Sequence, residues 1–146
     1  MTTYLLLFSL LLHNSNDDVK QVVKEFHQLT TEETELDFIN RYFDSQNPSI
    51  MAYVTTISMK QAEHSLNPFR KLQLFEINRD RLNLLIEENS TNIHLRYVRL
   101  ISQENTPFFL GYNNSIEEDK KILNNILAVE DETDYLDYFI RANTSL

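Results

Sequence analysis

The chain contains a single glycine, at position 111, and only three prolines, at positions 48, 68 and 107, in 146 residues. Because β-rich and loop-rich proteins use these residues at their turns, such scarcity argues against both classes. It also excludes glycine-rich phosphate loops and dinucleotide-binding fingerprints, which need several glycines at fixed spacing. Leu, Asn, Glu and Ile are among the most frequent residue types, which is compatible with a helical protein. The sequence therefore predicts an all-α fold.

Chain length predicts one domain, because 146 residues can enclose a single core without covalent cross-links. There are no cysteines, which excludes disulfides, thiolate metal sites and cysteine nucleophiles. Apolar residues recur at helical spacing from residue 17 onwards and predict six to seven helices, beginning near residues 17, 32, 48, 68, 92, 115 and 133. The short connections favour antiparallel helix pairs, either as an αα-solenoid with tetratricopeptide-like packing or as an irregular bundle.

Residues 67–112 form the centre of this pattern. Asn67-Pro68 should begin a long helix that ends near Glu88, and a second helix should cover residues 93–104. The long helix has two apolar stripes, Leu72, Phe75, Leu82 and Ile86 on one and Leu74, Ile77, Leu84 and Leu85 on the other. A helix with two stripes is expected to contact neighbours on both sides, so we expect an inner helix pair here.

An aromatic segment follows Pro107, with the sequence FFLGY at 108–112. These side chains are too apolar for a solvated loop, so we expect the segment to fold back on the helices. Gly111 should supply a backbone conformation that a side chain would hinder.

The N-terminal residues 4–12, YLLLFSLLL, are the most apolar run in the chain. The run is too short to span a bilayer and has the length of a signal-peptide core, although no basic residue precedes it and no small-residue cleavage motif follows. We expect a signal peptide in residues 1–15, a single helical domain in residues 16–146, and an exported or periplasmic protein. The alternatives are a buried first helix and a cytoplasmic location.

The net charge is −9, and residues 67–113 are the one region with a slight positive balance. An acidic chain is poorly suited to nucleic acids and anionic membrane surfaces, since both bind through basic groups. We therefore expect no nucleic-acid partner and no membrane span. Another protein is the expected partner, and the oligomeric state is left open.

Arg96 and Arg99 lie one turn apart on a largely apolar helix. Together with Tyr112 they could bind a carboxylate or phosphate of a small ligand, because guanidinium groups donate in pairs to such anions. In the alternative interpretation they form ion pairs with acidic residues of an adjacent helix, such as those at 117–119.

The histidines at 27, 64 and 94 show no metal-ligand spacing, and the acidic run 130–134 lacks the glycine turn of a calcium loop. The sequence thus predicts no metal, no cofactor and no catalytic residue. It favours a non-enzymatic helical domain for protein interaction or scaffolding. The alternative is a small anionic ligand-binding protein, or an unrecognised enzyme, that uses Arg96, Arg99 and residues 107–112.

Four motifs follow one another along the chain: NPFRKL at 67–72, LRYVR at 95–99, PFFLGY at 107–112 and EEDKK at 117–121. In this order and spacing the chain resembles a family of small, uncharacterised, mostly exported helical proteins of Bacteroidota. The resemblance covers roughly residues 50–127. It implies a helical, exported protein and assigns no activity.

Overall fold

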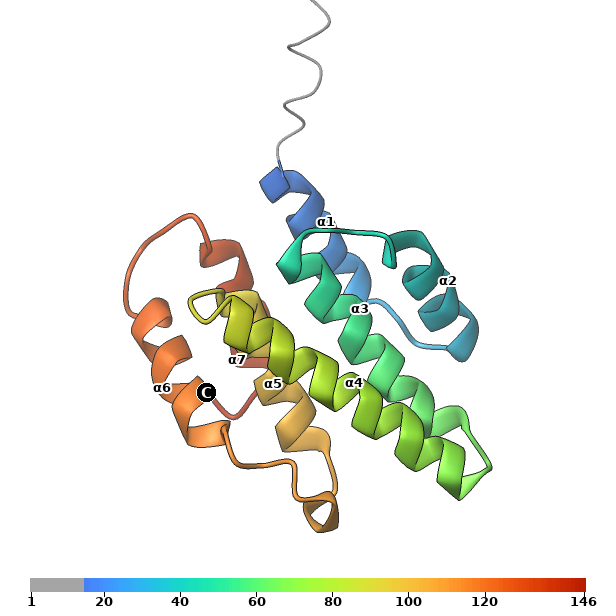
Figure 1. Cartoon of the computed structure of the whole chain (residues 1–146). Helices are drawn as coiled ribbons and strands as arrows, with labels where there is room; N and C mark the ends of the chain where they lie inside the picture. The colour runs from blue at the N-terminus through green and yellow to red at the C-terminus, as the bar shows by residue number, and fades with distance from the viewer. Residues whose placement is uncertain (1–14) are drawn as a thin grey trace, which may run out of the picture.

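The computed structural model describes residues 15–146, in which helices alternate with short connections and no strand occurs (Figure 1). The α-helices are α1 (Ser15–Phe26), α2 (Glu32–Tyr42), α3 (Pro48–Lys60), α4 (Pro68–Glu88), α5 (Ile93–Asn105), α6 (Ile116–Leu127) and α7 (Asp137–Asn143). Three short 3-10 helices accompany them, η1 (Gln61–His64), η2 (Phe108–Leu110) and η3 (Asp134–Leu136). The all-α prediction is confirmed. The expected signal peptide falls almost wholly outside the described residues.

Asparagine caps explain why three of the helices begin where they do. The side-chain oxygens of Asn47, Asn67 and Asn92 accept the backbone N–H two residues later, at 2.9, 2.9 and 3.0 Å. A proline follows each of the first two caps, at the position where its missing N–H has no intrahelical partner. The helix starts predicted at 48 and 68 therefore coincide with those in the structure.

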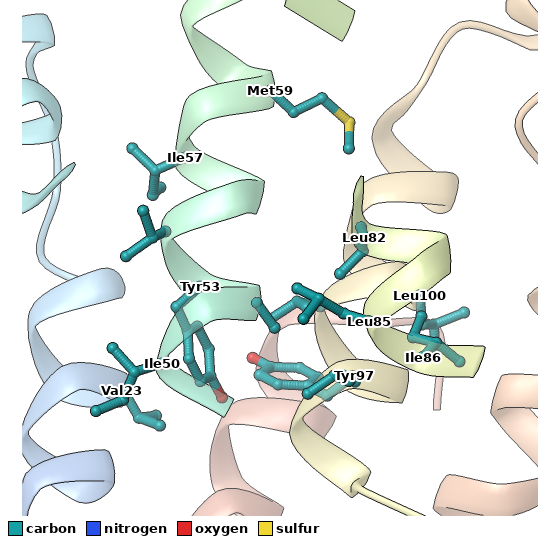
Figure 2. Packing of buried hydrophobic residues seen from close by; sticks show 14 of the residues in the cluster. Val23, Ile50, Tyr53, Ile57, Met59, Leu82, Leu85, Ile86, Tyr97 and Leu100 are labelled. Carbon is teal, nitrogen blue, oxygen red and sulfur yellow. The ribbon is translucent and has the colours of Figure 1, made fainter. Parts of the chain in front are cut away.

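Helix α3 lies at the centre of the fold and packs against α1, α2, α4 and α5. Figure 2 shows Tyr53 of α3 between Val23 of α1 and Leu85 of α4, with Ile57 farther along α3. Buried side chains from α1 to α7 form one hydrophobic cluster. All helices that pack against α3 lie within two helices of it in sequence, as in a solenoid, but α7 also returns to the first helix, where the Phe139 ring stacks on His27 just after α1. This contact between the two ends of the described chain makes the fold an irregular bundle.

Helix α4 buries one face that takes residues from both apolar stripes, namely Phe75, Leu82 and Ile86 of the first and Leu85 of the second. By contrast, Ile77 and Leu84 of the second stripe are 58% and 53% exposed. The expectation that α4 has neighbours on both sides is therefore wrong within residues 15–146. Helix α5 is the inner member of the pair, because its Leu95 is completely buried, as are its Tyr97, Val98 and Leu100.

The segment after Pro107 differs from the expectation at two residues. Phe108 and Phe109 are 84% and 85% exposed, although we expected them to fold back on the helices. Both phenylalanines of the short 3-10 turn η2 face outward, whereas Leu110 at its end packs against the core and Tyr112, beyond Gly111, is buried. Gly111 has a φ of +65°, in the left-handed region, as predicted.

In residues 15–146 there is no helix whose length and apolar character would let it cross a lipid bilayer.

Candidate functional site

The two predicted anion-binding arginines lie beside the first turn of α6. The Asp119 carboxylate is completely buried and accepts hydrogen bonds from Arg99 Nε and Nη2, both at 2.7 Å. Arg96 Nη1 donates to the same carboxylate at 3.2 Å, and its Nε and Nη2 donate to the Ser90 carbonyl oxygen at 3.3 and 3.1 Å. Glu118 lies farther out and contacts both arginines at 3.2 and 3.5 Å.

This geometry matches the ion-pair interpretation of Arg96 and Arg99. Burial opposes the charge of Arg99, but the hydrogen bonds and charge of Asp119 outweigh it and raise the pKa of Arg99. Asp119 also lies in the first turn of α6, where the helix dipole favours a negative charge. An incoming anion would have to displace a buried carboxylate, and neither arginine lines the two cavities described below.

Tyr112, the third predicted ligand-binding residue, is part of the core. Its hydroxyl donates to Asn83 Oδ1 at 3.2 Å, and its ring meets the Phe75 ring edge-on at a centroid distance of 5.9 Å. Burial raises the pKa of Tyr112, so the phenol stays protonated at neutral pH. Tyr112 lies near Arg99, but its hydroxyl and ring contact Asn83 and Phe75 of α4.

His94 is held between two tyrosines that the sequence did not connect with it. Its Nδ1 lies 2.8 Å from the Tyr53 hydroxyl and its Nε2 lies 2.8 Å from the Tyr135 hydroxyl. Burial lowers the pKa of His94 to about 4, so the ring is neutral at pH 7. The Tyr53 hydroxyl is fully buried and bonds to His94 alone in the described residues, and donation to Nδ1 is the arrangement that leaves its proton hydrogen-bonded. His94 therefore carries its proton on Nε2 and donates to Tyr135.

A second neutral histidine, His27, joins α1 to α5 and α7. The Tyr97 hydroxyl donates to the Phe139 carbonyl at 3.0 Å and accepts from His27 Nε2 at 2.9 Å. The His27 ring stacks on Phe139 at a centroid distance of 4.6 Å, and burial lowers the pKa of His27 to about 4. Like His94, His27 connects different helices, and its Nε2 is hydrogen-bonded within the protein.

The buried carboxylate of Glu35 connects α2 to the end of α3. It accepts hydrogen bonds from Lys60 Nζ at 2.7 Å, Gln61 Nε2 at 2.7 Å and His64 Nε2 at 2.8 Å. Burial raises the pKa of Glu35, but these three partners lower it by a larger amount. The net pKa of Glu35 therefore lies below its ordinary value. Across residues 15–146, no group of three or more potential ligands is placed to hold a metal ion.

The larger of the two cavities is an apolar groove of about 900 Å³. It lies between the end of α1, the second half of α3 with η1, the first half of α4, and the end of α5 with η2. Its apolar lining is Phe26, Leu29, Ile57, Met59, Ala62, Pro68, Leu72, Phe75, Ile101, Pro107, Phe109 and Leu110. Figure 2 shows Met59 projecting from α3 toward α4 and α5. The smaller cavity, about 440 Å³, lies between α2 and α4 and is lined by Glu32, Arg70 and Leu74 among others.

The hydroxyl and amide side chains that line the large groove are bonded to their own helices, and its His27 and Lys60 are bonded to Tyr97 and Glu35. The hydroxyls of Thr56 and Ser102 donate to carbonyl oxygens one turn earlier, at 2.9 and 2.7 Å. Thr106 Oγ1 and Asn105 Nδ2 do the same at 2.6 and 2.8 Å. The groove therefore offers mainly apolar atoms to an occupant. Lys71 and Glu63 are exposed charges at its edge.

Sequence reasoning did not find this groove. Four segments that are distant in the chain form it, so no local motif encodes it. The one available signal was the excess of apolar residues after Pro107, which we interpreted as core packing. Of the residues there, Phe109 proves to form part of the groove edge.

Comparisons with known proteins do not add to this geometry. A scan against protein-family models, a search of curated proteins and a search of solved structures each gave no match. The resemblance to exported Bacteroidota proteins therefore stays a prediction.

Proposed function

We propose that this domain is a non-enzymatic binding protein that accepts an apolar face of a partner protein's helix in the groove between α1, α3, α4 and η2. The observation that carries the proposal is the exposure of large apolar side chains at the groove edge. Leu72 is 44% exposed, and Phe109 is exposed over most of its surface. Contiguous apolar surface of this kind marks interaction sites in soluble proteins.

The polar groups of the groove favour a helix over a small anionic ligand. A small-ligand site usually combines an apolar wall with a few polar groups that converge on the ligand. Here Thr56, Ser102 and Thr106 have their hydroxyl protons bound to backbone carbonyls. Arg96 and Arg99 are bound to Asp119 on another side of the molecule. An apolar helix face needs no polar partner from the groove, since its backbone hydrogen bonds are internal.

Charge at the groove edge gives the partner helix a further feature. Lys71 is exposed at one edge in a chain that is otherwise acidic. A partner helix with apolar residues at i, i+3, i+4 and i+7 and an acidic residue beside Lys71 would complement both the shape and the charge.

The proposal is tested by selecting helical peptides from a library with randomised amphipathic faces and measuring their affinities by fluorescence anisotropy. We expect selected peptides to bind the wild type and to lose at least about tenfold in affinity to Leu72→Lys and Phe109→Lys, because charge then enters an apolar contact. Phe43→Lys is the matched control, since Phe43 is 61% exposed and is not a groove residue.

A medium-chain fatty acid serves as the competing ligand in the same assay. Displacement of the peptide by the fatty acid at low concentration, with no peptide of comparable affinity, would identify the groove as a small-molecule site and refute the proposal. Equal effects of Phe43→Lys and Phe109→Lys on peptide binding would also refute the proposal, because the peptide would then not bind in the groove.

A further inference from the structure

The outer face of α4 carries a row of residues, named the seam here, at the spacing found in coiled coils. Six residues on it follow a 4-3-4-3-4 spacing, namely Arg70, Leu74, Ile77, Arg81, Leu84 and Glu88. This is the spacing with which two helices pack along a shared seam. Leu74 is half-buried and the other five are exposed. No helix of residues 15–146 covers Ile77 and Leu84 of the seam, and Arg70 and Leu74 line the smaller cavity beside α2.

We propose that this seam is an interface between two copies of the chain, with their α4 helices paired antiparallel. The sequence is self-complementary in that direction about a midpoint at residue 79. Leu74 of one copy then faces Leu84 of the other, Ile77 faces Arg81, and Arg70 faces Glu88. The two-fold axis repeats each of these contacts, as a closed homodimer requires.

Charge selects the antiparallel arrangement. Arg70 lies in the first turn of α4 and Glu88 is its last residue, so antiparallel pairing places opposite charges together at both ends. A parallel pair would place Arg70 against Arg70 and Glu88 against Glu88, and would align the two helix dipoles. Arg81 lies opposite Ile77, where its aliphatic stem can cover apolar surface while the guanidinium reaches solvent.

The interface should be weak. A helix of 21 residues is about 31 Å long, and a single helix pair of that length lies at the low end of specific interface sizes. We therefore expect a dimer with a micromolar or weaker dissociation constant. The groove is a separate surface, so this inference does not depend on the proposed function.

Sedimentation equilibrium of the full chain from about 10 μM to about 1 mM tests for the dimer. Arg70→Glu and Glu88→Arg should each weaken dimerisation at least about tenfold, because each places like charges together twice. The double variant should restore it. Within one chain the two residues lie about 27 Å apart along the helix, so restoration can arise only between copies. Both changes suit the helix dipole of α4, so the fold should tolerate them.

Disulfide trapping tests the register, since the chain has no cysteine of its own. A mixture of Leu74→Cys and Leu84→Cys chains should form a cross-linked heterodimer under mild oxidation. Leu74→Cys alone should not, because residues 74 of the two copies would lie about 15 Å apart along the axis.

Three results would overturn the inference. They are a monomer throughout the concentration range, a double charge variant that remains as weakened as either single variant, and faster cross-linking of Leu74→Cys alone than of the mixture. Leu72→Lys should dimerise like the wild type, which separates a failure of this interface from a failure of the groove.

Discussion

Lowering the pH from about 7 to about 5 should destabilise the fold by about 2 kcal/mol through His94 alone. The buried imidazole has a pKa of about 4 in the folded protein against an ordinary value of 6.5. Between these values the unfolded chain binds a proton and the folded protein does not. The contribution of His94 is therefore fully present above pH 6.5 and is lost as the pH falls toward 4, by about 3 kcal/mol in total.

The variant His94→Asn isolates this effect from that of other titrating groups. Asparagine can place its side-chain oxygen near the position of Nδ1 and so still accept from Tyr53, but it does not titrate. At pH 7 the variant should lose about 1–3 kcal/mol, because Tyr135 loses its bond and a gap remains. Between about pH 7 and about pH 5 its stability should fall by about 2 kcal/mol less than that of the wild type.

Urea unfolding followed by far-UV circular dichroism at several pH values between these limits gives the free energies. His27 has a similarly low pKa and remains in both proteins, so the comparison concerns His94 specifically. Parallel pH dependences for wild type and His94→Asn would refute the reasoning, because His94 would then titrate alike in the folded and unfolded chains.

Two further predictions concern single positions. Asp119→Ala should destabilise the protein by about 3–5 kcal/mol in urea unfolding, because two buried arginines lose their shared partner. Glu118 is exposed, so Glu118→Ala should destabilise it by less than about 1 kcal/mol. Equal losses of stability in the two variants would contradict this account. Gly111→Ala should cost about 1 kcal/mol in thermal unfolding, because φ is +65° but nothing lies within 4 Å of the added methyl group. A loss above about 3 kcal/mol would instead indicate a steric conflict.

The helices could be predicted because their signals are local. Asn47-Pro48 and Asn67-Pro68 combine a cap with a residue suited to the first turn, and the structure begins helices at both prolines. Gly111 was correctly predicted to adopt a special backbone conformation, because φ > 0 favours glycine over any other residue. Each of these inferences needs only a few neighbouring residues.

The polar interior could not be predicted, because its partners are far apart in the chain. Tyr53 and His94 are separated by 41 residues, and His27 and Tyr97 by 70. No spacing rule connects such pairs, since their meeting depends on how α1, α3 and α5 pack. The prediction that α4 has neighbours on both sides was wrong for a related reason. Periodicity shows which faces are apolar, but it does not say whether another helix of the same chain or another molecule covers them.

The two proposed surfaces lie on different sides of α4. Leu72 in the groove and Ile77 on the seam are five residues apart, which places them about 140° apart around the helix axis. Pairing through the seam would therefore leave the groove of each copy open. The two-fold axis would then present two identical grooves on one particle, so a partner with two suitable helices would gain from effective concentration. Leu72, Ile77 and Leu84 of α4 are exposed large apolar residues, and two separate binding faces would account for the exposure of all three.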